Sequence, residues 1–183
     1  MNVSVPFTAE QAKQLKAGDT ITISGVIYTA RDAAHKRMLE DYHKTGKFPF
    51  DIENQIVYYA GPAPAKPGQA IGSVGPTTSY RMDAYSPALL QLGLRGMIGK
   101  GARSQEVIKA MKQYSGVYFG ATGGAGALLA NHIEKVEIIA YEDLGAEAIR
   151  KLTVKEFPVI VIIDSNGNNL YETEPQKYKR VNQ

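Results

Sequence analysis

Segments typical of strands alternate with segments typical of helices along almost the whole chain, and this alternation limits the possible folds more than any other feature. The strand-like segments are rich in β-branched residues, and the helical ones repeat apolar residues every three or four positions. We expect strands at 21–28, 55–60, 70–74, 94–98, 117–119, 136–141 and 158–163. We expect helices at 8–15, 32–44, 86–93, 104–114, 127–132 and 144–152. Such alternation predicts an α/β fold in which helices cover a mixed sheet.

Short polar residues mark where several of these segments begin. Thr8, Asp32 and Ser104 each precede a stretch with helical spacing, and their side chains can accept hydrogen bonds from the free amides of the first turn. We therefore expect them to be helix N-caps. Asn166-Gly167 predicts a tight turn that returns the chain into a last short strand at Leu170-Tyr171.

The length of the chain fits one domain. A chain of 183 residues can bury one sizeable core but not two, and 44% hydrophobic with 21% charged residues is typical of a globular protein. The proline- and glycine-rich stretch from Gly61 to Gly75 resembles a linker, but Ala70–Val74 inside it has a strand-like composition. We expect a structured loop there, and one domain over 1–183 with its core at about 6–171.

Several classes of function are excluded or disfavoured by composition. The chain has no cysteine, so it cannot form a disulfide, a thiolate nucleophile or a cysteine-ligated metal site by itself. A net charge of +3 from scattered residues gives no nucleic-acid-binding stripe. The N-terminus does not resemble a signal peptide, and no apolar run is long enough to span a membrane. We expect a soluble cytoplasmic protein without nucleic-acid or membrane partners.

Four polar residues follow strand-like segments and form a candidate site: Arg31, Thr77, Arg81 and Lys100. Ligands of α/β proteins usually bind at the carboxyl ends of strands. Three cations and a hydroxyl at that edge would bind a small molecule with carboxylate or phosphate groups, because arginine donates two parallel hydrogen bonds to such groups. The alternative is that all four are ordinary solvated surface residues.

The segment from Gly75 to Asp83, with the sequence GPTTSYRMD, favours the site over that alternative. Gly-Pro fixes a turn, and three successive hydroxyls can contact an anion. If the segment becomes helical, Thr77 and Arg81 lie on one side. A purely structural account would make Thr78 or Ser79 an N-cap and pair Arg81 with Asp83.

Two further features leave alternatives open. His35 follows Asp32 by three residues, so it either assists protonation or orients Asp32, or it lies on the helix surface without a catalytic role. His35 and His43 lack a third ligand at metal-binding spacing, so we expect no metal site there. The glycine-rich turn at 120–126 either allows a close strand–helix crossing or belongs to a stand-alone anion- or nucleotide-binding module.

Taken together, four segments resemble the iron–sulfur hydro-lyases. They are 30–37 (ARDAAHKR), 75–83 (GPTTSYRMD), 99–101 (GKG) and 123–127 (GGAGA). More narrowly, the chain resembles the β subunit, or C-terminal domain, of class I fumarase and L-tartrate dehydratase, roughly from Pro6 to Tyr171. The order and spacing of the 75–83 block make it the most specific of the four.

The resemblance implies a hydro-lyase that reversibly adds or removes water on a small dicarboxylate, with fumarate and L-malate first and L-tartrate second. It implies a 4Fe-4S cluster held by three cysteines of a separate α subunit, with which a cysteine-free β subunit is consistent. It also implies a heterotetramer of two α and two β subunits, and a swivelling three-layer β/β/α architecture for this chain.

For individual residues, the resemblance implies that Arg31, Arg81 and Lys100 bind the substrate carboxylates. Thr77 would be the base that removes a proton next to a carboxylate, although the sequence leaves open whether Thr77 or Thr78 has this role. A non-catalytic scaffold subunit that keeps the fold is a third possibility, beside the hydro-lyase subunit and the binding module.

Overall fold

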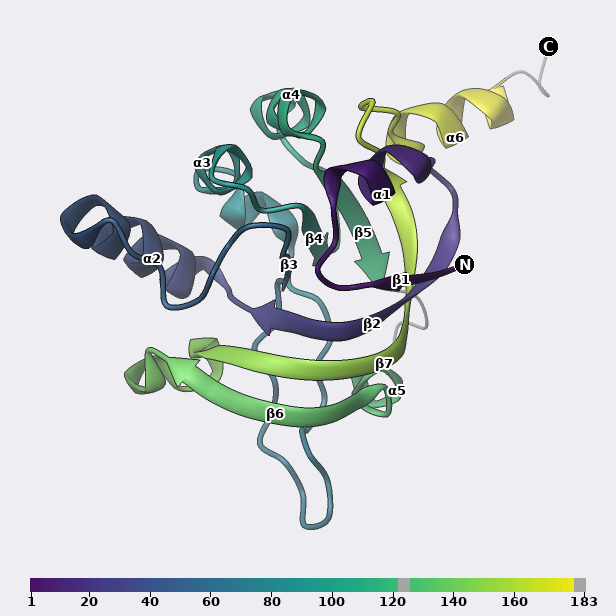
Figure 1. The fold of residues 1–183 in the computed structure, drawn as a ribbon. Helices are drawn as coiled ribbons and strands as arrows, with labels where there is room; N and C mark the ends of the chain where they lie inside the picture. The colour runs from purple at the N-terminus through teal and green to yellow at the C-terminus, as the bar shows by residue number, and fades with distance from the viewer. Residues whose placement is uncertain (122–125, 180–183) are drawn as a thin grey trace.

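The computed structural model describes residues 1–121 and 126–179 (Figure 1). Its strands are β1 (Asn2–Ser4), β2 (Thr20–Thr29), β3 (Ile56–Tyr58), β4 (Gly96–Gly99), β5 (Val117–Ala121), β6 (Ile133–Ala140) and β7 (Ile149–Ile163). Its α-helices are α1 (Ala9–Gln14), α2 (Asp32–Thr45), α3 (Ser86–Gln91), α4 (Gln105–Tyr114), α5 (Gly126–Ala130) and α6 (Leu170–Lys179). Two 3-10 helices complete the chain, η1 (Ser79–Met82) and η2 (Glu142–Glu147).

Five of the strands close into a mixed barrel. β2, β3, β4 and β5 are parallel neighbours, and β7 pairs antiparallel with both β5 and β2, which closes the ring. Ile160 of β7 lies opposite Thr20 of β2 and also opposite Gly120 of β5, so β7 bonds to one of these strands at each of its edges. β1 and β6 extend the sheet outside the barrel. The result is a single mixed α/β fold, as the alternation in the sequence predicts.

Side chains of the barrel strands alternate between two cores. Ile56 and Tyr58 of β3 point inward with Phe119, into an inner core that α1 closes with Ala12. Val57 belongs instead to an outer core between the barrel and helices α2, α3 and α4. This period of two is the geometry of a strand, whose successive side chains point to opposite faces. Because both faces are covered, the short parallel strands read as continuous apolar runs.

The predicted helix starts are partly confirmed. Thr8 accepts a hydrogen bond from the Gln11 amide at 3.3 Å, and the Gln11 side chain accepts one from the Thr8 amide at 2.8 Å, which forms a capping box. Ser104 caps α4 in the predicted way. The expectation for Asp32 is wrong, because Arg31 is the N-cap of α2 and the Ala33 amide in its first turn donates to a carboxylate oxygen of Glu147 at 3.4 Å. Asp32 is the first helical residue.

Residues 144–152 do not form the predicted helix. Glycine at position 145, with φ +63, interrupts the segment, and η2 ends at Glu147. The apolar residues that suggested helical spacing instead enter β7, where Leu152 lies opposite Ile27 on one side and opposite Val136 on the other. Pairing with two strands outweighs the local pattern, because tertiary contacts decide between helix and strand for short apolar segments.

The expected strands at 70–74 and 170–171 are also absent. Residues 61–76 form a loop, which we call the 61–76 loop, and it projects away from α4 and α6 (Figure 1). A Cβ at Gly72 would lie 2.4 Å from the carbonyl oxygen of Ala63, so the two sides of this loop touch at glycine. Leu170 begins α6, because the carbonyl oxygen and side chain of Asn169 accept hydrogen bonds from the first amides of that helix.

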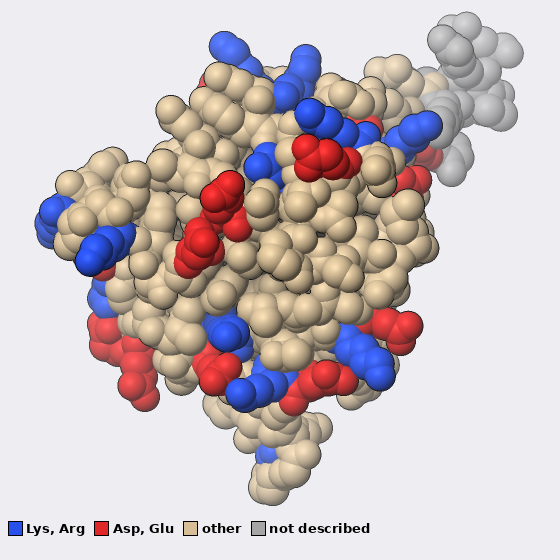
Figure 2. All heavy atoms as spheres, viewed as in Figure 1, with Lys and Arg blue, Asp and Glu red and all other residues tan. Residues whose placement is uncertain are grey.

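Charged residues of both signs are mixed over the face shown in Figure 2. The 61–76 loop, which projects at the lower end of that view, carries one charged residue, Lys66. Among the described residues, no helix is both long and apolar enough to cross a membrane.

Candidate active site

The carboxyl ends of the parallel strands bring the predicted site segments together. Pairing continues past the strand ends, because the Ala30 amide donates to the Tyr58 oxygen at 3.1 Å and the Tyr59 amide donates to the Ile98 oxygen at 2.9 Å. Arg31 therefore follows directly on one strand of this edge, and Lys100 follows on another. This edge is where ligands of parallel sheets commonly bind.

The 61–76 loop returns to the same edge with the GPTT segment. The Thr77 amide donates to the Tyr59 oxygen at 2.6 Å, and Thr78 forms a parallel bridge with Lys100. The Ser79 amide then donates to the Lys100 oxygen at 2.8 Å. These bonds place Thr77 between the end of β3 and Lys100, although Thr77 and Lys100 are far apart in sequence.

Arg81 and Lys100 are exposed and unpaired at this edge. Arg81 lies on η1, which begins one residue after the Thr78 bridge. Within residues 1–121 and 126–179, neither side chain forms a hydrogen bond or ion pair. The structural account of this segment is wrong, because Thr78 makes no capping bond and Asp83 pairs with Arg103 instead of Arg81. Two unpaired cations so close to Thr77 are suited to an anionic ligand.

Arg31 is more enclosed than the other two cations. Its guanidinium lies 3.6 Å from a carboxylate oxygen of Asp32 and 3.6 Å from one of Glu147. A Cβ at Gly61 would lie 3.1 Å from Cδ of Arg31, so the glycine leaves room for this side chain. Its Nε is buried and has no hydrogen-bond partner among the described residues. Glu147 was not found from the sequence, because it comes from η2, more than a hundred residues later.

His35 is fully buried, so the interpretation as a helix-surface histidine is wrong. Its Nδ1 lies 2.8 Å from the carbonyl oxygen of Arg31, which can only accept, so Nδ1 carries the proton. No hydrogen bond joins it to Asp32 among the described residues. Burial lowers the pKa of the His35 imidazole to about 4, so the ring is neutral at physiological pH.

Arg103 forms an ion pair with Asp83 at the end of η1. Sequence reasoning missed Arg103 and considered Asp83 only as a partner of Arg81. Nε of Arg103 donates to Asp83 at 2.7 Å, and the other carboxylate oxygen of Asp83 accepts from the Ser104 amide at 2.7 Å. Burial by itself lowers the pKa of Arg103, but Tyr59 and Asp83 raise it above its ordinary value, so the guanidinium stays charged. The only signal in the sequence was Asp83 itself, at the end of the GPTTSYRMD segment.

Two other predictions can be compared with the structure only in part. Among the described residues, no group of three or more histidine, cysteine, aspartate or glutamate side chains could hold a metal ion. Within the glycine-rich turn at 120–126, residues 122–125 lie outside the described residues. The flanking parts are the end of β5 and the start of α5.

Comparison with known proteins assigns the chain to a family. The family described as fumarase C-terminus matches residues 1–174. The chain belongs to this family. It is 39% identical to a protein named putative L(+)-tartrate dehydratase subunit beta from Methanocaldococcus jannaschii, over 97% of the chain and 94% of that protein.

Fumarate hydratases are also among the proteins to which the chain is similar. The chain is 38% identical over 94% of its length to a putative class I fumarate hydratase of Geobacillus stearothermophilus, and 39% identical over 88% to the aerobic class I enzyme of Escherichia coli. It covers 34% and 30% of those two proteins, so it spans about a third of their length. The resemblance inferred from the four sequence segments is confirmed at the level of the family.

Proposed function

We propose that this chain is the β subunit of a hydro-lyase that reversibly adds or removes water on a small dicarboxylate. Fumarate and L-malate are the first candidates, and L-tartrate is the second. One observation carries the proposal: the bridge between Thr78 and Lys100, which gathers Thr77, Arg81 and Lys100 at one edge of the barrel, where Arg81 and Lys100 have no partner among the described residues. Membership of the fumarase C-terminus family supports the reaction class.

In this proposal the three cations bind the two carboxylates of the substrate. Arg81 and Lys100 are exposed and unpaired in the described part of the chain, so they can exchange water for a carboxylate at little cost. Arg31 lies 3.6 Å from the carboxylates of Asp32 and Glu147 and remains partly accessible. A substrate held at both ends presents one defined carbon to the base, and this restriction lowers the entropic part of the barrier.

Thr77 is the proposed base. A threonine hydroxyl is a weak base in water, so it needs nearby positive charge to stabilise the alkoxide form. Lys100, joined to the same segment through the Thr78 bridge, and Arg81 are the cations available for this. They also stabilise the negative charge that develops on the substrate when the proton leaves a carbon beside its carboxylate.

The described residues contain no set of ligands for a metal, and the whole chain lacks cysteine, so the proposed 4Fe-4S cluster belongs to a separate α subunit. When bound there, the cluster would supply a Lewis acid for the substrate hydroxyl. Two α and two β subunits form the proposed heterotetramer, with the edge that carries Thr77 facing the α subunit. The mixed barrel, with α2 to α4 packed on its outside, also supports a three-layer β/β/α arrangement of the swivelling type.

Anaerobic purification of the tagged chain from its native extract tests this proposal. The eluate is assayed for water addition to fumarate and mesaconate and for water removal from malate and tartrate. We expect a cysteine-containing partner to copurify, with activity on one pair of substrates, and no activity from the isolated chain. Activity of the isolated chain, or an inactive eluate without a cysteine-containing partner, would overturn the proposal.

A further inference from the structure

The buried side chain of Arg103 lies next to the candidate site. The Arg103 side chain has 0% exposure, and arginine is seldom buried unless several groups satisfy its charge and donors. Its Nε donates to Asp83 at 2.7 Å, and one Nη donates to Ser86 at 2.8 Å and to the Tyr59 hydroxyl at 3.3 Å. The guanidinium is therefore held in one orientation by Tyr59 and by two residues of the 83–86 stretch.

The same guanidinium lies over two aromatic rings. Its central carbon lies 5.3 Å from the ring centre of Tyr59 and 4.9 Å from that of Tyr118. Tyr59 directly follows β3, and Tyr118 belongs to β5. A cation over an aromatic face is attracted to it, and more strongly so when water is excluded. Arg103 thus joins the residue that follows β3 to β5, the neighbour of β4.

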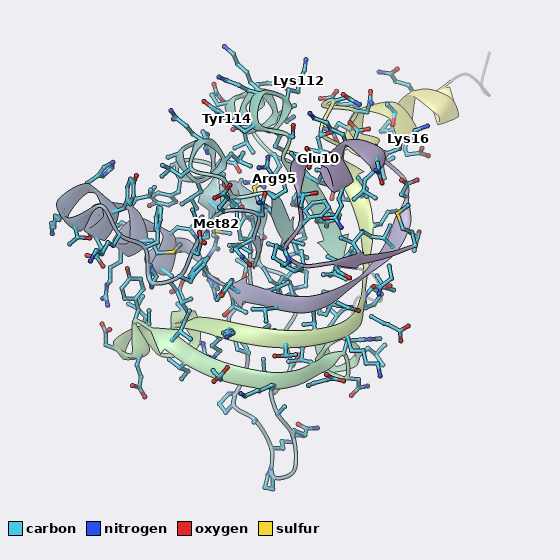
Figure 3. The ribbon with its side chains drawn as sticks, in the orientation of Figure 1. Glu10, Lys16, Met82, Arg95, Lys112 and Tyr114 are labelled. Atoms are coloured by element: carbon cyan, nitrogen blue, oxygen red, sulfur yellow. The ribbon has the colours of Figure 1, made fainter. Side chains whose placement is uncertain are left out.

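The contacts of these residues fix both ends of η1. At its start, the Ser79 hydroxyl lies 2.8 Å from the Tyr118 hydroxyl. The Tyr118 hydroxyl is also 2.8 Å from the carbonyl oxygen of Gly101, next to Lys100. At the far end, Asp83 receives the Arg103 bond and the Ser104 amide. Arg81 lies between the two fixed points, while the neighbouring Met82 is buried in the outer core (Figure 3).

Stability alone does not explain such an arrangement, because a buried ion pair is often no more stabilising than apolar side chains of similar volume. Its effect is to define one geometry. We propose that Arg103 is a positioning residue, which holds η1 so that Arg81 and Lys100 act on the same dicarboxylate. This inference rests on the proposed function and assigns Arg103 no contact with the substrate.

The test uses Arg103→Met and Arg103→Lys in the purified complex. We expect kcat/KM for the dicarboxylate to fall by about 100-fold in Arg103→Met, mainly through a higher KM, because misplacing a binding group by about 1 Å has an effect of this size. We also expect faster hydrogen exchange at the Thr77 and Ser79 amides of the full chain. For Arg103→Lys, both kcat/KM and the exchange rates should lie between those of Arg103→Met and those of the unmodified protein.

Arg95→Met is the matched control. Arg95 is partly buried and donates to the carbonyl oxygen of Tyr114 and, at 3.3 Å, to the side chain of Asn54, but it precedes β4, at the opposite end of the parallel strands (Figure 3). Its replacement should lower the free energy of unfolding while KM and the exchange of Thr77 and Ser79 stay unchanged.

A double-mutant cycle with Asp83→Asn separates positioning from general loosening. If Arg103 acts through Asp83, the losses in kcat/KM are not additive, and the double variant resembles Arg103→Met alone. Additive losses, or unchanged KM and exchange in Arg103→Met, would overturn the inference. If Arg103→Met does not fold, KM, kcat/KM and hydrogen exchange of Arg103→Lys and Asp83→Asn test the inference instead. An inactive unmodified complex would overturn the proposed function instead, and hydrogen exchange would still report on the positioning.

Discussion

His35 donates its Nδ1 proton to the carbonyl oxygen of Arg31 across 2.8 Å, and the backbone amide of His35 donates to the same oxygen at 2.9 Å. Both bonds hold Arg31, the N-cap of α2, next to the end of β2. The ring packs edge-on against Tyr59, with ring centres 5.4 Å apart, in the outer core. The neutral form of a buried histidine thus supports the backbone from which the Arg31 side chain extends.

This arrangement predicts a pH-dependent stability. Because burial lowers the pKa of His35 to about 4, the unfolded chain binds a proton between pH 6.5 and 4 that the folded chain does not. The free energy of unfolding therefore falls as pH drops through this window, and His35 contributes no pH dependence above it. We expect a loss of about 2 kcal/mol from this residue between pH 7 and pH 5, measured by urea unfolding.

Asparagine at position 35 provides the comparison, since its amide can still donate to Arg31 but does not titrate. His35→Asn should flatten the pH dependence, whereas His43→Asn, an exposed position on the same helix, should leave it as in the unmodified protein. An unchanged pH slope in His35→Asn would show that other groups cause the effect.

Replacing the proposed base should affect turnover more than binding. Thr77→Val keeps the shape of the side chain and removes its hydroxyl, so kcat of the complex should fall by roughly 10²- to 10⁴-fold with little change in KM. Thr78→Val is the matched control, because Thr78 lies next in the chain and bridges Lys100 through its backbone. A loss only in Thr78→Val would assign the base to Thr78, and equal losses in the two variants would contradict a role specific to Thr77.

Removing one of the unpaired cations should weaken binding. A charge-assisted hydrogen bond contributes about 1.5–3 kcal/mol, so Arg81→Gln or Lys100→Met should lower kcat/KM by roughly 10- to 100-fold, mainly through KM. Arg37→Gln serves as control, because Arg37 already forms an exposed ion pair with Asp143 at 2.7 Å. We expect kcat/KM of Arg37→Gln to change by less than about twofold. Steady-state kinetics of the complex provide the measurement.

Gly99 is predicted to tolerate no side chain. A Cβ there would lie 2.0 Å from the Ser79 hydroxyl and 2.8 Å from the Tyr59 ring, both of which are buried. Gly99→Ala should therefore displace the start of η1, lower the free energy of unfolding by about 1–3 kcal/mol and reduce activity. Gly75→Ala, where the nearest atom would be 3.9 Å away, should be close to neutral. Urea unfolding of both variants tests this, and equal stabilities would contradict it.

The local signals in the sequence determined the parts of the fold that depend on neighbouring residues. Thr8 and Ser104 cap helices because their side chains reach amides three residues away. The β-branched run after Thr20 forms β2 because its side chains alternate between the two faces of the sheet. The GPTTSYRMD segment also indicated the site, because its residues are close together in the chain.

The tertiary structure alone decided what depends on residues far apart. Whether 149–152 is helix or strand depends on hydrogen bonds to β2 and β6, not on local spacing. Burial of His35, the approach of Glu147 to Arg31 and the pairing of Arg103 with Asp83 likewise require the barrel to close. A local pattern specifies which backbone shapes a segment favours, but its partners come from strand register and packing, which no short stretch of sequence contains.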